Sequence, residues 1–390
     1  MLNIEITKEQ WKEDLNFLNH TIISNHLNPF HFVTKKFINN QYQEALKRIE
    51  IGSNSECALA LTDFAAKFGD GHTYARPYDS FHDLPIYFRW FGDRLHIQDI
   101  QVDLKKYQGW EIIKFGAYSP KELLEKASSL VAQGESAGYF KNEAQSILRF
   151  IEVLNYLKIT NENNFLELTV RGKESQIEII KICIKQSCDM SNMTKTFKNV
   201  PLFYSRMNEP LWFQKIEGTD IGYFNFTSYP SKKEIKEFAK DLNEWIKKET
   251  FKTLLIDFRI NGGGDGNRGK IILDKIKKTV LSKNINVYVA IGEVTFSAGM
   301  GNASDFHKGL KGTFIGKPTG ARPNGYQENN SFTLPKSKMS CSYSSDYYTY
   351  SENDTPGIFP DIYIESSWEE FYHGEDPLIN RIINNKLREN

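Results

Sequence analysis

The chain has 390 residues, enough for two or three domains, and its 40% hydrophobic content suffices to fill ordinary cores. Its 49 basic and 49 acidic residues cancel, and no long block of one sign occurs. This balance speaks against nucleic-acid or membrane-surface partners, which attract a basic excess. No apolar run approaches the roughly 20 residues that span a bilayer, so we expect no transmembrane segment.

The N-terminus lacks the basic start and apolar core of a signal peptide. As written, the sequence therefore predicts a cytoplasmic protein, or an exported one if a signal preceded this start. No CxxC pair occurs, so we expect buried or inert reduced thiols at all four cysteines: Cys57, Cys183, Cys188 and Cys341.

Changes in hydrophobic period divide the chain into modules. A capping box at Thr7 and Gln10 starts a series of helical patterns, which end in a tight turn around His72. Strand patterns then alternate with two helices, expected from residue 119 and over residues 144–157, and end in a hairpin around Gly172. The predicted modules are a helical module (1–76), a mixed α/β insert (84–185), a linker (186–210) and an α/β core (211–390).

The core contains a strand–helix–strand pattern over residues 252–299. Two short apolar strands flank a helix expected over 270–281, and such a unit almost always forms a right-handed crossover in a parallel sheet. Both strands then end at the same edge of the sheet, where α/β proteins bind ligands. We therefore expect the glycines after the first strand and Ser297 after the second to lie side by side.

Ser297 lies between small residues at a predicted strand-to-helix junction. Its hydroxyl would face the sheet edge, and the amides that follow it could stabilise an oxyanion. The alternative is that Ser297 only caps its helix. The local pattern leaves both interpretations open.

Asn261 is followed by Gly262, Gly263 and Gly264, so backbone amides in this turn can approach a ligand closely. The spacing from Gly264 to Lys270 also fits the phosphate loop of nucleotide hydrolases. However, Ile271 stands where that loop needs a magnesium-binding Ser or Thr, which speaks against nucleotide binding.

A serine nucleophile needs a base to accept its proton. The candidates are His72, His307, Lys308, Lys317 and downstream carboxylates. His72 is favoured because it lies in a tight Gly-Asp-Gly-His-Thr turn at a module junction, and a neutral imidazole suits general-base work at physiological pH.

Together these motifs resemble the C-terminal processing, or tail-specific, serine peptidases, in the branch of the interphotoreceptor retinoid-binding protein and the tricorn core. The similarity covers most of the chain, with matching motifs in order: Asp70-Gly71-His72-Thr73, Ile256 to Gly263, Thr295 to Gly299, Gly316 to Gly320, and Phe359 to Ile362. The resemblance implies a ClpP/crotonase-type α/β core, an N-terminal helical module and a PDZ-like α/β insert.

The resemblance also implies roles for single residues. Ser297 would be the nucleophile, and the oxyanion hole would use the amides of Ala298 and of Gly262 or Gly263. Many relatives use a serine–lysine dyad, but Arg322 occupies the lysine position here and cannot lose its proton.

The tricorn-like arrangement remains, with His72 as base and a downstream glutamate. Glu352 fits that second role, Glu328 is its rival, and Asp70 would orient the histidine or only shape the turn.

We therefore expect a serine peptidase that acts on peptides or unfolded proteins and needs no cofactor or metal. The main alternative is an inactive relative that binds peptides or apolar ligands. A crotonase-like acyl-CoA enzyme is a third hypothesis, against which the paired Asn-Gly-Gly-Gly and Thr-Phe-Ser-Ala-Gly motifs speak.

Overall fold

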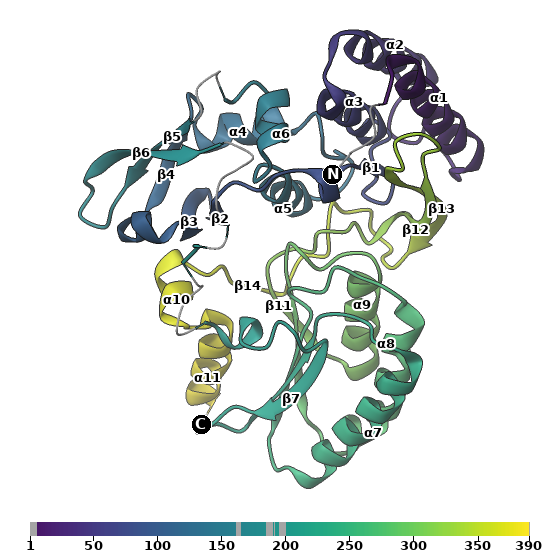
Figure 1. The fold of residues 1–390 in the computed structure, drawn as a ribbon. Coiled ribbons are helices and arrows are strands. Elements are labelled where there is room, and N and C mark those ends of the chain that lie inside the picture. Colours follow the sequence, from purple (N-terminus) through teal and green to yellow (C-terminus); the bar gives the residue numbers. More distant parts are fainter. Residues whose placement is uncertain (1–5, 161–164, 185–189, 191, 195–199, 390) are drawn as a thin grey trace. The chain divides into compact units, whose positions relative to one another are not determined.

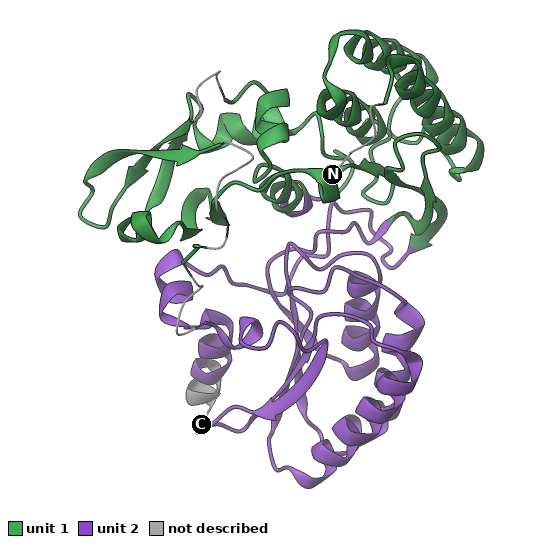
Figure 2. Cartoon of the chain, viewed as in Figure 1, with its two compact units in different colours: residues 1–135, 140–196, 325–348 green, residues 136–139, 197–324, 349–390 purple. Residues whose placement is uncertain are grey.

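The computed structural model describes residues 6–160, 165–184, 190, 192–194 and 200–389. The chain is mixed α/β and forms two compact units (Figures 1 and 2). Unit 1 comprises residues 1–135, 140–196 and 325–348, and unit 2 comprises residues 136–139, 197–324 and 349–390. The α/β class expected from the sequence is confirmed.

Unit 1 begins with three helices, α1 (Lys8–Asn25), α2 (Lys35–Ile51) and α3 (Asn54–Ala66). The expected capping box at Thr7 is present: Thr7 accepts from the Gln10 amide, and the Gln10 side chain accepts from the Thr7 amide. The apolar faces of these helices enclose one core, which includes Trp11, Leu15 and Phe64.

A small sheet packs against this helical core. Its strand order is β1 (Tyr74–Arg76), β13 (Ser340–Thr349) and β12 (Asn324–Thr333). The strand after the His72 turn therefore pairs with a strand from far down the chain, with Ala75 opposite Cys341. Leu334, Met339 and Cys341 join the helical core.

The rest of unit 1 is an antiparallel five-stranded sheet with three helices. Its strands, in spatial order, are β2 (Ile86–Phe91), β3 (Arg94–Ile100), β4 (Glu111–Phe115), β5 (Phe165–Arg171) and β6 (Ile177–Cys183). The helices are α4 (Pro120–Ala127), α5 (Ala137–Ile147) and α6 (Ile151–Tyr156). The single helix expected over 144–157 is wrong, because the backbone at Phe150 is extended and starts a new helix.

Unit 2 is built on a six-stranded sheet in the order β14 (Ile362–Tyr363), β11 (Thr313–Gly316), β10 (Asn286–Ile291), β9 (Thr253–Asp257), β8 (Ile221–Phe226) and β7 (Leu211–Lys215). All neighbours are parallel except β7 and β8. The expected parallel crossover from β9 to β10 is confirmed, with Leu255 opposite Tyr288.

Helices cover both faces of this sheet. On one face, α7 (Lys232–Lys248), α8 (Gly266–Ser282) and α9 (Ala298–Leu310) pack over Leu254 and Ile256. On the other face, α11 (Pro377–Glu389) packs over Leu255, and α10 (Trp368–His373) precedes it. Because β9 is buried on both faces, its sequence is a continuous apolar run rather than an alternating one.

The cysteines differ from the expectation. Cys57 and Cys341 are buried free thiols, but Cys183 is disulfide-bonded, so the expectation of four reduced cysteines is wrong.

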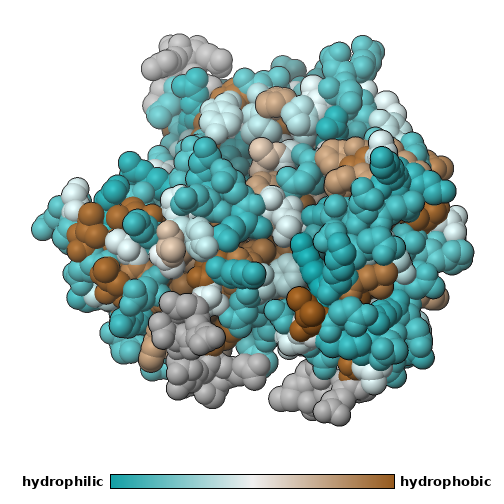
Figure 3. All heavy atoms as spheres, turned by 90° about the horizontal axis from the view of Figure 1, so that it is seen from above, coloured by the Kyte–Doolittle hydropathy of each residue, from teal (hydrophilic) through white to brown (hydrophobic). Residues whose placement is uncertain are grey.

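In the described part of the chain, no helix has both the length and the apolar character of a membrane span. On the face shown in Figure 3, hydrophilic residues predominate and apolar residues form small patches. The expected linker, residues 186–210, lies partly outside the described residues.

Candidate active site

Ser297 lies at the N-terminus of α9 with a backbone φ of 51° and ψ of −129°. A positive φ is strained for a residue with a side chain, and such strain often marks functional positions. The Ser297 side chain makes no hydrogen bond to the first turn of α9. Ser297 therefore occupies the N-cap position of α9 without capping the helix through its side chain.

The glycine turn after β9 lies directly against Ser297. Gly263 has a φ of 107°, and a Cβ built there would be 2.7 Å from the Ser297 Cβ. The Phe296 amide donates to the Asn261 carbonyl at 3.0 Å, which joins the two loops. The predicted juxtaposition of the glycine turn and Ser297 is confirmed.

Two amides at this edge have no partner among the described residues, those of Gly262 and Ala298. Ala298 opens α9, and a first-turn amide has no acceptor within its own helix. By contrast, the Gly263 amide donates to the Asn261 Oδ1 at 3.0 Å. A Cβ on Gly262 would meet nothing within 4 Å, so its surroundings are open.

A buried ion-pair network fixes the backbone just before the glycine turn. Arg259 binds Asp376 through two nitrogens, at 3.1 and 2.6 Å, and also binds Asp257 at the end of β9. The Tyr223 hydroxyl donates to Asp257 at 2.8 Å. Burial opposes the charge on Arg259, but the two carboxylates outweigh it and raise the pKa of Arg259 well above its ordinary value.

His72 lies in unit 1, in the turn between α3 and β1, and is 2% exposed. Its backbone amide donates to the Asp70 Oδ1 at 3.1 Å. Burial lowers the pKa of His72 to about 4, against the opposing charges of Asp70 and Glu328. The imidazole is therefore neutral at physiological pH and able to accept a proton.

The Asp70 carboxylate organises this turn. It accepts from the His26 Nε2 at 3.0 Å, from the Ser344 hydroxyl and from the His72 backbone amide. Burial opposes ionisation of Asp70, but the hydrogen bonds from His26 and Ser344 and the nearby imidazoles lower its pKa. Asp70 thus shapes the turn through the backbone of His72.

The two candidate glutamates lie in different units. Glu328 is in β12 of unit 1 with a φ of 66°, and it accepts from the Tyr348 hydroxyl at 2.6 Å. Its charge raises the pKa of His72. Glu352 is exposed and lies after β13, in unit 2. Arg322 also belongs to unit 2, before β12, and pairs with Asp354 at 2.9 Å. Unit 2 therefore brings together Ser297, Gly262, Gly263 and Ala298, and unit 1 brings together His72, Asp70 and Glu328.

His26, His31 and Asp70 are close enough to be considered as metal ligands, with one ligand atom from each within 4.8 Å of the others. The His26 Nδ1 accepts from the Asn28 amide at 3.0 Å, so the Nε2 must bear the proton and donate it to Asp70. Neither nitrogen of His26 then has a lone pair for a metal. These residues do not fit a metal site in this arrangement.

A contact near Ser297 has no counterpart in the sequence patterns. The segment 136–139 belongs to unit 2, although it lies in the predicted insert. The Ser136 amide donates to the Gly320 carbonyl at 3.3 Å, and the Tyr139 ring stacks on Phe296 with centroids 4.8 Å apart. No local sequence signal reveals such a contact, because it joins segments far apart in the chain.

No family model and no curated protein matches the sequence. Solved structures do match over nearly the whole length. Mature CPAF superposes with a TM-score of 0.64 at 12% identity, covering 97% of this chain and 98% of CPAF. Mature CPAF complexed with lactacystin gives a TM-score of 0.63 at 13% identity, covering 96% and 97%.

The chain has the fold of mature CPAF. A serine-to-alanine mutant of CPAF also matches, with a TM-score of 0.60 at 12% identity, over 94% of this chain and 95% of the mutant. C-terminal processing peptidases are among the structural neighbours, as the resemblance in the sequence predicted. At these identities the likeness establishes the fold alone, so the activity must be argued from the site.

Proposed function

We propose that this chain is a serine peptidase with Ser297 as its nucleophile. The observation that supports this most directly is the position of Ser297, which has a strained backbone and lies against the glycine turn. That turn contains the Gly262 amide, and the Ala298 amide follows Ser297 directly. Strained backbone at a strand-to-helix junction exposes a serine hydroxyl to a substrate, which a structural serine does not need.

In the proposed mechanism, Ser297 Oγ attacks the scissile carbonyl and His72 accepts its proton. The negative charge that develops on the carbonyl oxygen is stabilised by the amides of Gly262 and Ala298. Gly263 is the weaker candidate, since its amide already bonds to Asn261. His72 then returns the proton to the leaving amine, and water hydrolyses the acyl-enzyme by the same route.

For the carboxylate that stabilises the histidine, we favour Glu328 over Glu352. Glu328 belongs to the same unit as His72 and its charge raises the pKa of the imidazole. Glu352 remains the candidate that the resemblance implies. A lysine dyad is excluded as before, because Arg322 is permanently charged.

The finer architecture is part of the same proposal. Residues 211–390, apart from residues 325–348 that belong to unit 1, would correspond to a ClpP/crotonase-type core. Residues 84–185 would form a PDZ-like insert, residues 1–76 the helical module and residues 186–210 a linker. The proposed substrates are peptides or unfolded proteins, because the structural neighbours are peptidases.

Hydrolysis of a mixed peptide library, followed by mass spectrometry, tests the proposal. We expect wild-type chain to generate cleavage products that Ser297→Ala and His72→Asn do not. Equal product formation by all three would show contaminating activity, and no products from any of them would favour the inactive, ligand-binding alternative.

A further inference from the structure

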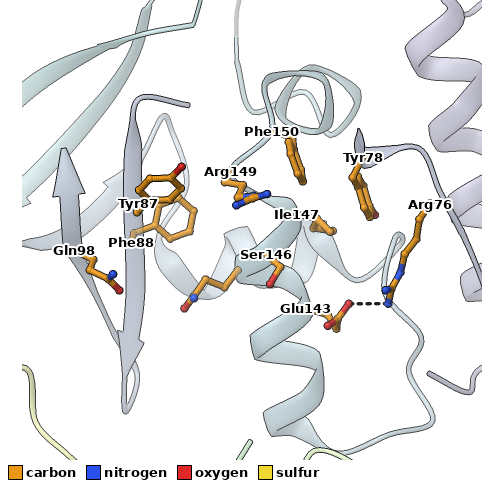
Figure 4. A pocket seen from close by; sticks show the side chains of 11 residues that line it. Arg76, Tyr78, Tyr87, Phe88, Gln98, Glu143, Ser146, Ile147, Arg149 and Phe150 are labelled. Carbon is orange, nitrogen blue, oxygen red and sulfur yellow. Dashed lines mark hydrogen bonds and ion pairs between the residues drawn. The ribbon is translucent and has the colours of Figure 1, made fainter. Parts of the chain in front are cut away.

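Unit 1 contains a cavity of about 480 Å³, within the size range of small-molecule sites (Figure 4). It is partly open and is lined by the end of β1 and the turn after it, strands β2 and β3, the second half of α5 and the residues that follow α5. None of these residues belongs to the site proposed for peptide hydrolysis. The cavity therefore needs its own explanation.

Aromatic rings form the walls of this cavity. Tyr78 and Phe150 stack with their ring planes 3° apart and their centroids 5.2 Å apart. Tyr87 and Phe88, from β2, stand on the other side, and Figure 4 shows the Arg149 side chain between the two pairs. A flat apolar group could pack against Tyr87 and Phe88, beside the Arg149 side chain.

The charges that line the cavity are unequal. Arg76 and Arg149 contribute two positive charges and Glu143 one negative charge, which leaves a net charge of +1 (2 − 1). Arg76 is paired with Glu143 at 3.3 Å (Figure 4, dashed line). Arg149 is thus the positive side chain that has no acidic partner among the residues lining the cavity.

Arg149 has one ion-pair partner outside the lining of the cavity, Asp83. Its Nε lies 3.2 Å from the Asp83 Oδ1, within ion-pair distance, yet that oxygen has no hydrogen bond of acceptable geometry among the described residues. The Arg149 side chain is 42% exposed, and its guanidinium lies 4.7 Å from the centre of the Phe150 ring. A planar guanidinium held in this way presents its remaining N–H groups to a carboxylate.

We propose that this cavity binds a small organic anion with a flat apolar body, namely an aromatic carboxylate. The carboxylate pairs with Arg149, and the ring packs beside this guanidinium against Tyr87 and Phe88. The Arg76–Glu143 pair closes one side and supplies no further free charge, so the site takes one anionic group and not two. The proposal does not depend on the peptidase activity.

The test uses the full chain and the anionic aromatic dye 1-anilinonaphthalene-8-sulfonate, whose fluorescence rises on binding. Arg149→Gln is expected to weaken dye binding by about tenfold or more, the value of one lost charge-assisted contact. Arg149→Lys should restore part of the affinity, and Ser146→Trp should abolish binding by filling the cavity. Arg94→Gln, an exposed arginine on β3 outside the cavity, is the matched control and should bind as wild type does.

Competition identifies the chemistry of the ligand. N-acetyl-phenylalanine should displace the dye, whereas its neutral amide should not. If a peptide with a free C-terminal phenylalanine also displaces the dye, the natural ligand is the C-terminus of a peptide chain. If only the small acid displaces it, the natural ligand is a free small carboxylic acid.

The proposal is overturned if variants that melt at the wild-type temperature bind the dye as wild type does. It is also overturned if the amide competes as well as the acid, because the cavity would then be merely apolar.

Discussion

Gly263 and Ser297 are so close that no side chain fits between them: a Cβ at position 263 would be 2.7 Å from the Ser297 Cβ. This contact joins the loops after β9 and β10 at one edge of the parallel sheet. Position 263 requires glycine for two reasons: a side chain would collide with Ser297, and the backbone has a φ of 107°. The neighbouring Gly262 has neither constraint, which makes the two glycines a natural pair for comparison.

Gly263→Ala should therefore destabilise unit 2 and displace Ser297. We expect a loss of about 2 kcal/mol or more in the free energy of unfolding, from strain at positive φ together with the close contact. Gly262→Ala keeps its amide and has open space, so it should change stability by less than about 1 kcal/mol. Urea unfolding measures both, and equal losses for the two variants would contradict this account.

Because the pKa of His72 is low in the folded chain, the free energy of unfolding depends on pH. Burial lowers this pKa to about 4, so between pH 6.5 and pH 4 the unfolded chain binds a proton that the folded chain does not. The contribution of His72 is complete above pH 6.5 and is lost as the pH falls towards 4, by at most about 3 kcal/mol.

Urea unfolding at a series of pH values measures this effect. His72→Asn should show a shallower decline over the same pH window. If wild type and variant declined in parallel, the imidazole would titrate alike in the folded and unfolded states.

Glu328 and Glu352 are distinguished by exchanging each for glutamine. Glu328 raises the pKa of His72, so Glu328→Gln should move the acid limb of the pH–rate profile to lower pH and reduce the rate. Glu352→Gln is the isosteric control and should leave the limb in place. The opposite pattern would assign the carboxylate role to Glu352.

Tyr139 holds the residue that precedes the proposed nucleophile, through its stacking on Phe296. Tyr139→Ala removes a buried ring, and we expect it to lower the free energy of unfolding by about 3 kcal/mol. It should also slow the reaction of Ser297 with a fluorophosphonate probe severalfold. Tyr139→Phe keeps the stacked ring and should stay near wild type in labelling rate. A Phe variant as impaired as the Ala variant would show that the hydroxyl, and not the stacking, matters.

Local features of the fold were predictable because their causes are local. The capping box at Thr7 sets the start of α1, and the strand–helix–strand pattern of residues 252–299 predicts the sheet edge. The strain at Ser297 was not predictable, because it depends on the neighbouring glycine turn and not on the serine's own sequence context.

Features that depend on distant segments were missed. Strand β13 pairs with β1 across about 270 residues of chain, and residues 136–139 join unit 2 from within the predicted insert. The influence of Glu328 on His72 also follows from this pairing, since β12 lies beside β13. The sequence therefore offered candidate site residues but ranked the two glutamates by motif alone.

The most direct test of the account is labelling of the full chain with a fluorophosphonate probe, followed by mapping of the modified residue by tandem mass spectrometry. We expect one adduct, on Ser297, which is absent in Ser297→Ala and forms much more slowly in His72→Asn, while both variants keep the wild-type melting temperature. An unlabelled wild-type chain, or an adduct that persists in Ser297→Ala, would contradict the claim that Ser297 is an activated nucleophile.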